Sequence, residues 1–215
     1  LNARVRELDI RDGAVRGVVL EDGEEIRAGI VISAVNPRTT VMNLVPDGAD
    51  GWQGLKDRMA TRKMRGKAYK LVLALDAMPR YAAATSDDEA RALASAQFRI
   101  APTVDYLEEA HADMMLGRSP ANPVIWGLCP SMTSAGHAPE GKHLLSLNIA
   151  TAPYRLKQGT WAEEGPKLAR RCIETAACWM PNLPDIINDY RFVDPEEFER
   201  DFGLIEANIT HGDAL

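Results

Sequence analysis

The chain has 215 residues, 46% of them hydrophobic, so it can bury a sizeable core in one or two domains. Acidic residues outnumber basic ones by 31 to 25, and the resulting net charge of −6 gives no electrostatic footprint for nucleic acid. No apolar run approaches the ~18–20 residues of a membrane-spanning helix, and the three cysteines lack metal-ligand spacing, so we expect a soluble, cytoplasmic protein with neither a disulfide framework nor a metal site.

Two adjoining patterns near the N-terminus predict a β-hairpin followed by one more strand. Residues 15–28 alternate between apolar and polar side chains on either side of an Asp-Gly turn. Residues 30–34 then form an unbroken run of apolar and small residues, typical of a strand buried on both faces of a parallel sheet. Asn36 predicts the cap of a following helix, and Pro37 its first residue.

The rest of the chain mixes strand and helix patterns without a regular βαβ alternation. We expect helices at residues 52–62, 103–116 and 161–180 and after Asp194, and strands at residues 69–75, 97–100, 124–129, 143–151 and 190–192. The Gly-Pro pair at 165–166 must kink the third helix or mark its true start. This order predicts an α+β fold in which helices cover one face of an antiparallel sheet. The other face would then line a cavity.

The two ends of the chain carry a family resemblance. Residues 17–37 read G-V-V-L-E-D-G-E-E-I-R-A-G-I-V-I-S-A-V-N-P, residues 194–204 read D-P-E-E-F-E-R-D-F-G-L, and residues 208–212 read N-I-T-H-G. These three stretches resemble the phytoene dehydrogenase branch of the FAD-dependent, amine oxidase-like oxidoreductases. Between them the likeness is one of order and spacing rather than of motif.

The resemblance implies that residues 1–38 are a remnant of an FAD-binding domain, consisting of the hairpin and the buried strand, and that residues 39–215 form the substrate-binding domain. In this family a G-x-G-x-x-G turn near the N-terminus holds the FAD pyrophosphate, and a second Gly-rich segment follows the late stretch. Neither segment occurs in this sequence. We therefore expect the chain to be the middle of a longer FAD enzyme, inactive and without cofactor when isolated.

The resemblance also suggests site residues. Val5 matches a strand position whose backbone contacts the FAD adenine, and Ser33 and Ala34 end a strand near the cofactor. His211, within I-T-H-G, is the candidate catalytic residue, facing flavin or substrate, with a structural turn as the alternative. Candidate substrate contacts on the predicted sheet, each of which could equally be core, are Tyr69, Leu71, Trp126 and Leu147.

Glu206 and Ala207 depart from the resemblance. Family members often carry glycine between the F-G-L and I-x-H-G parts, and this chain has none between them. The departure puts the local backbone and the placement of His211 in doubt.

The sequence offers no nucleophile with its base: G-x-S-x-G, H-E-x-x-H and Cys–His patterns are all missing. A flavin enzyme needs little acid–base equipment, because the isoalloxazine accepts the hydride. We therefore expect the full-length protein to dehydrogenate a hydrophobic small molecule by hydride transfer to flavin. Two alternatives remain, a cofactor-free α+β binding or interaction module and a non-redox flavin isomerase. Peripheral membrane contact of the full-length protein and self-association through the first forty or so residues also stay open.

Overall fold

The computed structural model describes residues 3–212 and divides the chain into two compact units. The first unit runs to Met64 and includes the C-terminal residues from Thr210; the second runs from Arg65 to Ile209. The division falls at Met64 rather than at residue 38, so residues 39–64 belong to the N-terminal unit. The assignment of one part to FAD binding and the other to substrate binding stays a prediction.

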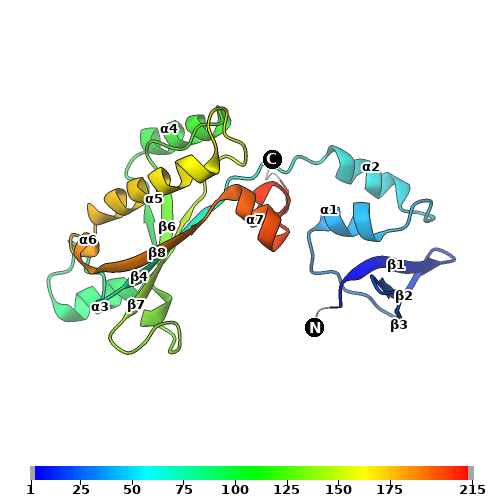
Figure 1. Ribbon diagram of the computed structural model, residues 1–215, viewed down its shortest axis with the longest axis horizontal. Helices are drawn as coiled ribbons and strands as arrows, with labels where there is room; N and C mark the ends of the chain where they lie inside the picture. Colours follow the sequence, from blue (N-terminus) through cyan, green and yellow to red (C-terminus); the bar gives the residue numbers. More distant parts are fainter. Residues whose placement is uncertain (1–2, 213–215) are drawn as a thin grey trace. The chain divides into compact units, whose positions relative to one another are not determined.

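The first unit is built on a three-stranded antiparallel sheet (Figure 1). Its strands, in the order β1-β2-β3, are β1 (Val5–Arg11), β2 (Ala14–Leu20) and β3 (Glu25–Arg27), followed by α1 (Pro37–Thr39), the π-helical turn η1 (Thr40–Leu44) and α2 (Gln53–Thr61). The predicted hairpin is confirmed as β2 and β3. Leu8 and Leu20 from the sheet and Val41 from η1 are buried, which gives this unit a small core.

The structure corrects the expectation for residues 30–34. No strand is assigned there, and Ile30 and Ile32 are 82% and 89% exposed. An extended segment becomes a strand only when neighbouring strands accept its backbone hydrogen bonds, and no strand of the described residues pairs with this segment. The apolar pattern therefore appears in the structure as an exposed apolar segment.

The second unit has an α+β fold, as predicted, with a five-stranded antiparallel sheet in the order β5-β6-β7-β4-β8. The strands are β4 (Tyr69–Leu75), β5 (Phe98–Ile100), β6 (Ile125–Leu128), β7 (His143–Ile149) and β8 (Ile187–Val193). The helices are α3 (Asp87–Ser95), α4 (Val104–Met115), α5 (Trp161–Ala177), α6 (Leu183–Ile186) and α7 (Pro195–Phe202), with short 3₁₀ turns η2 (Pro130–Met132) and η3 (Ile205–Ala207).

Side-chain caps fix where several helices begin. Asn36 Oδ1 accepts a hydrogen bond from the Arg38 backbone, as its position before Pro37 predicts. Thr103, Thr160 and Asp194 cap α4, α5 and α7 in the same way. The helix boundaries that follow from these polar residues agree with the predicted ones.

The core of the second unit lies between the sheet and α5. Alternate residues of β4 and β7, including Leu71 and Leu147, are fully buried against Trp161, Leu168 and Cys172 of α5. α5 runs continuously across the Gly-Pro pair. Gly165 permits this close packing, because a Cβ there would lie 2.6 Å from the Phe192 ring of β8.

No helix within the described part of the chain is long and apolar enough to cross a membrane.

Candidate functional site

The two faces of the five-stranded sheet differ in what they carry. One face packs on α5, and the side chains of the other point away from it, because successive residues of a strand alternate between faces. Strand register aligns Trp126 of β6 with Asn148 of β7 and Lys70 of β4 on this second face. We call this surface the open face; it includes Lys70, Val72, Ala74, Arg99, Trp126, Leu128, Ser146, Asn148, Asp189 and Arg191.

Lys70 lies at the centre of a polar network on the open face. Its Nζ donates to Ser146 Oγ at 2.8 Å and to Asn148 Oδ1 at 3.1 Å, and Asn148 Nδ2 donates to the Trp126 carbonyl at 3.4 Å. Both acceptors of the ammonium are neutral, and partial burial lowers the pKa of Lys70. A lysine held in this way can donate to a neutral ligand oxygen or, once deprotonated, accept a proton.

Apolar surface surrounds this network. Trp126, Val72 and Leu128 are half-buried rather than packed in the core. The guanidinium of Arg99 lies 4.6 Å from the centroid of the Trp126 ring, which holds the indole in place by a cation–π contact. The open face therefore combines aromatic and aliphatic contact area with one amine and two neutral polar side chains, the mixture typical of a site for a largely apolar small molecule.

Three of the four predicted substrate contacts lie elsewhere. Tyr69, Leu71 and Leu147 point toward α5 and are at most 1% exposed, and the Tyr69 hydroxyl donates to the Gly165 carbonyl at 2.8 Å. Burial raises the pKa of Tyr69 well above its ordinary value. These three residues form core, and Trp126 alone of the four lies on the open face. Period-two alternation reveals that a strand has two faces, but not which of them a helix covers.

The predicted cofactor contacts lie in the first unit. Val5 opens β1 opposite Leu20, the Ser33 hydroxyl lies 2.7 Å from Thr40 Oγ1, and Ala34 is exposed. Each has an ordinary local role here, and their proximity to FAD stays a prediction.

His211 also belongs to the first unit. Its backbone is left-handed, with φ of 58°, and its Nδ1 is buried without a hydrogen-bond partner among the described residues. A buried, unpaired imidazole nitrogen costs free energy, because it loses hydration without gaining a hydrogen bond. The role of His211 facing flavin or substrate stays a prediction.

The departure at Glu206 and Ala207 has a structural counterpart. Both residues adopt left-handed backbones, with φ of 50° and 55°, which glycine would tolerate without strain. Gly66 lies directly against them, since a Cβ on Gly66 would be 1.2 Å from the Glu206 carbonyl oxygen. The segment expected to be glycine-rich is thus strained and tightly packed in this chain.

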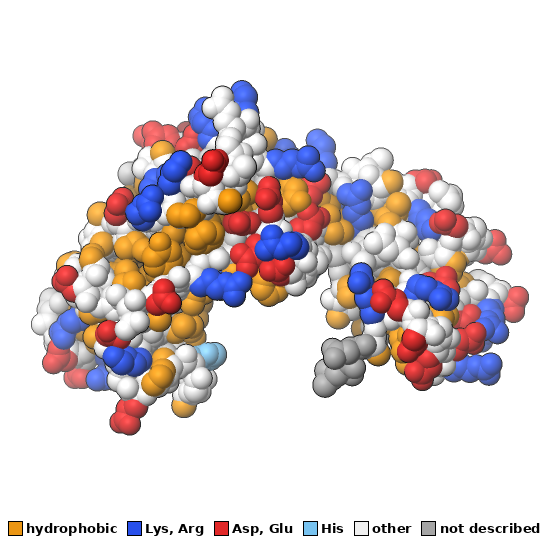
Figure 2. All heavy atoms as spheres, in the orientation of Figure 1, with side chains coloured by type: hydrophobic (Ala, Val, Ile, Leu, Met, Phe, Trp, Pro, Cys, Tyr) orange, Lys and Arg blue, Asp and Glu red, His pale blue; other side chains and the backbone are white. Residues whose placement is uncertain are grey.

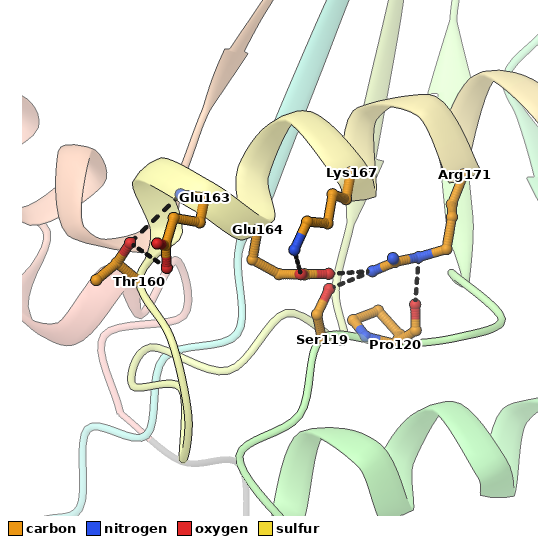
Figure 3. Close-up of polar contacts among 7 residues, drawn as sticks. All are labelled: Ser119, Pro120, Thr160, Glu163, Glu164, Lys167 and Arg171. Atoms are coloured by element: carbon orange, nitrogen blue, oxygen red, sulfur yellow. Dashed lines mark hydrogen bonds and ion pairs between the residues drawn. The ribbon is translucent and has the colours of Figure 1, made fainter.

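A second polar cluster joins α5 to the loop after α4 (Figure 3). Arg171 donates to Glu164 at 2.7 Å, to Ser119 Oγ at 2.5 Å and to the Pro120 carbonyl at 3.2 Å, and Lys167 lies 3.5 Å from the other oxygen of Glu164. Burial alone would raise the pKa of Glu164, but the hydrogen bond and charge of Arg171 outweigh it and lower that pKa.

Two cavities flank the loop at residues 154–160, beside this cluster. One, of about 410 Å³, is lined by Gly117, Ser119, Lys157 and Glu164 among others. The other, of about 590 Å³, is lined by Tyr154, Trp161, Glu199 and neighbouring residues, and the Tyr154 hydroxyl donates to Glu199. At the first cavity Glu164 pairs with Arg171 and Lys167, and at the second Glu199 accepts from Tyr154, so both carboxylates help to position the loop.

The sequence did hold a signal for the network that the predictions missed. Lys70 interrupts the apolar alternation of β4, and Ser146 and Asn148 do the same on β7. Polar residues at every second position of an otherwise apolar strand indicate a face that is not core. The pairing of β4 with β7 brings Lys70, Ser146 and Asn148 together, and the sequence of neither strand alone predicts that pairing.

No protein-family model matches the chain. It is 28% identical over 207 residues to pyridine nucleotide-disulfide oxidoreductase domain-containing protein 2 of Rattus norvegicus, covering 94% of this chain and 35% of that protein, and the Mus musculus protein of the same name gives the same values. The chain thus spans about a third of the length of the curated relatives it matches.

Among solved structures, reduced UDP-galactopyranose mutase matches with a TM-score of 0.53 and 13% identity, over 97% of this chain and 38% of that one, which is a likeness of fold alone. The likeness to the curated relatives supports an oxidoreductase-like assignment at a general level, and it does not single out the phytoene dehydrogenase branch.

Proposed function

We propose that the full-length protein is an FAD-dependent oxidoreductase and that the second unit forms the substrate side of its active site. The observation that carries the proposal is the open face, where a half-buried lysine with neutral partners lies within aromatic and aliphatic surface. The oxidoreductase names of the curated relatives and the motif resemblance support the redox assignment.

The finer proposal is dehydrogenation of a hydrophobic small molecule, as in phytoene dehydrogenase-like enzymes. FAD, when bound, would accept the hydride from a substrate C–H bond. Trp126, Val72 and Leu128 would contact the apolar body of the substrate and exclude water from it. The third N–H of the Lys70 ammonium would donate to a polar group of the substrate, or to a water, and so fix the substrate's position on the open face.

The chain's own residues fit the substrate side better than the cofactor side. No Gly-rich turn in this sequence could bring backbone N–H groups against a pyrophosphate. We therefore assign the FAD phosphates to other parts of the full-length protein. Val5, Ser33 and Ala34 remain proposed minor contacts, and His211 a proposed contact to flavin or substrate.

We further propose a cytoplasmic protein whose partner is a hydrophobic small molecule. Such a substrate partitions into lipid, so the full-length protein would collect it by peripheral contact with a membrane surface.

The proposal is tested with the full-length protein. We expect flavin absorbance at about 450 nm, bleached anaerobically by a hydrophobic donor such as a polyene or amine. Lys70→Met and Trp126→Ala should slow this reduction at least about tenfold at unchanged FAD content, which corresponds to about 1.4 kcal/mol of lost transition-state stabilisation. Lys142→Met, at an exposed loop of the same unit, is the matched control and should have no effect.

Three other outcomes would redirect the assignment. Absence of flavin in the intact protein would favour the cofactor-free binding module. Bound flavin that no hydrophobic donor reduces would favour a non-redox isomerase. Unchanged reduction rate and substrate affinity in His211→Ala would reject a functional role for that histidine.

A further inference from the structure

β8 forms one edge of the five-stranded sheet. It pairs with β4 on one side and with no strand of the described residues on the other. Asn188, Asp189, Tyr190 and Arg191 are all exposed. A strand edge of this length presents a row of backbone donors and acceptors that a second strand can pair with.

The geometry shows which backbone groups face outward. The Tyr190 N–H donates to the carboxylate of its neighbour Asp189 at 2.8 Å, so it points away from β4. Residues two apart in a strand present their backbone groups on the same side, so the N–H and C=O of Phe192 also face outward. The outer edge of β8 is therefore open to antiparallel pairing centred on Tyr190.

The sequence of this edge is complementary to itself. If two copies pair antiparallel about Tyr190, Asp189 of each copy lies opposite Arg191 of the other. Both residues point to the open face, because Val72 and Ala74 of β4 are their register partners. Opposite charges directly across an antiparallel pair are stabilising, and a two-fold dimer repeats the contact twice.

We propose that this chain forms a two-fold dimer by antiparallel pairing of β8 with β8 of a second copy. Tyr190 would face its own counterpart in a hydrogen-bonded pair, so its N–H would leave the Asp189 carboxylate, and Asp189 and Arg191 would occupy the closer, non-hydrogen-bonded positions. A peptide of unrelated sequence has no reason to match the Asp-Tyr-Arg order, which makes a second copy the occupant.

The surroundings of β8 favour this contact. Arg191 pairs with Glu197 in its own chain but is still 72% exposed at the side chain, so it can reach a second carboxylate. Figure 2 shows hydrophobic side chains gathered where β8 runs beside α5, and the Tyr190 side chain there is 39% exposed. Strand pairing buries less surface than a standard interface, so we expect a dissociation constant in the micromolar range.

The dimer would also enlarge the proposed site surface. Because Asp189 and Arg191 lie on the same sheet face as Lys70, pairing through β8 joins the open faces of the two copies into one continuous surface.

Charge reversal tests the proposal with the 215-residue chain in analytical ultracentrifugation. Asp189→Arg places Arg opposite Arg, and Arg191→Asp places Asp opposite Asp, so each variant alone should dissociate at least about tenfold more readily than the unsubstituted chain. Mixed together, the two variants restore both opposite-charge contacts and should form a heterodimer. The double variant Asp189→Arg/Arg191→Asp should form a homodimer again.

Two exposed positions outside β8 provide matched controls. Glu108→Arg on α4 and Arg170→Asp on α5 make the same changes in net charge and should leave the dimer unchanged. A chain that stays monomeric up to millimolar concentration overturns the proposal. So does a dimer whose dissociation constant in Asp189→Arg and in Arg191→Asp is the same as in the unsubstituted chain, because its interface then lies elsewhere. Failure of the mixed variants to associate, with each one folded, also overturns it.

Discussion

At the scale of single residues, Lys70 is the position where sequence pattern and structure say different things. Its strand is apolar enough to be core, yet its ammonium is held by Ser146 and Asn148 on the opposite face. Desolvation lowers its pKa because a partly buried charge loses hydration that neutral hydrogen-bond partners only partly replace. The lysine is thus tolerated at some cost in stability, which is typical of a functional group.

The first prediction follows from that cost. Lys70→Met should leave the free energy of unfolding unchanged or raise it by less than about 1 kcal/mol, since solvent screens a half-buried charge. Because the pKa of Lys70 is lower in the folded chain, its charged amine destabilises the folded state at neutral pH. This destabilisation fades as the pH rises from the folded pKa to the unfolded value of about 10.4. Urea unfolding of the unsubstituted chain and Lys70→Met from pH 7 to 10 measures the difference between their free energies of unfolding. A difference that widens as the pH rises would contradict the prediction.

The second prediction concerns Gly66 and the strained turn it contacts. Gly66→Ala must displace the Glu206 carbonyl, 1.2 Å from the added Cβ, and should lower the free energy of unfolding by about 3 kcal/mol or more. Glu206→Gly should raise it by up to about 1 kcal/mol, because the left-handed strain is relieved while the backbone N–H still donates to Glu199. Gly54→Ala on the exposed side of α2 is the control for a harmless methyl group. Urea midpoints followed by the intrinsic fluorescence of the four tryptophans report all three.

Residue-level prediction from the sequence succeeded where a backbone requirement was visible. Asn36 before Pro37 predicted a helix cap, and its Oδ1 accepts a hydrogen bond from the Arg38 backbone. Residue-level prediction left Tyr69, Leu71 and Leu147 open between substrate contact and core, because the choice needed knowledge of which sheet face α5 covers. That information resides in the packing of residues about a hundred positions apart along the chain.

At the scale of elements, the contact between α5 and the loop after α4 depends on Arg171 (Figure 3). Arg171→Met should lower the free energy of unfolding by about 1–3 kcal/mol, because Glu164, Ser119 and the Pro120 carbonyl lose their common donor. Arg170→Met, the exposed neighbour, should change it by less than about 0.5 kcal/mol.

This third prediction has a pH signature. The lowered pKa of Glu164 means that its pairing with Arg171 contributes stability above the unfolded value of about 4.3 and loses it as the pH falls through the folded pKa. The difference between unsubstituted chain and Arg171→Met should therefore shrink below about pH 4. A difference independent of pH would mean that the effect arises from packing alone.

The fourth prediction concerns the exposed apolar segment at residues 30–34. We expect Ile30→Lys/Ile32→Lys to reduce binding of a hydrophobic dye and to suppress self-association through the N-terminal unit, because large exposed apolar side chains tend to recruit other surfaces. Val104→Lys, an exposed position in the second unit, is the control. Light scattering separates this contact from β8 pairing, since the substitutions should leave the β8 dimer intact.

Elements were predictable where their signals are local. The β2–β3 hairpin follows from its turn, α4 and α7 follow from their caps, and α5 follows from its apolar periodicity. The segment at residues 30–34 was predicted as a strand from composition, but a strand exists only with neighbours, and its pairing is a non-local property.

At the scale of the whole molecule, the two units define what the isolated chain can do. We expect the 215-residue chain to purify colourless and to retain no FAD in equilibrium dialysis, because it has no Gly-rich pyrophosphate turn. The full-length protein in the same dialysis is the control. Stoichiometric absorbance at about 450 nm in the isolated chain would show that its own residues suffice to hold the cofactor.

The sheet order of the second unit also bears on biosynthesis. β4 lies between β7 and β8, so Leu71 must find both Leu147 and Phe192, partners made long after it. During translation β4 leaves the ribosome without either neighbour, and its apolar residues must wait until Val193 has emerged. Contacts so distant in sequence slow folding and prolong the exposure of aggregation-prone surface. We therefore expect the yield of native chain to depend on chaperones that shield β4 until synthesis is complete.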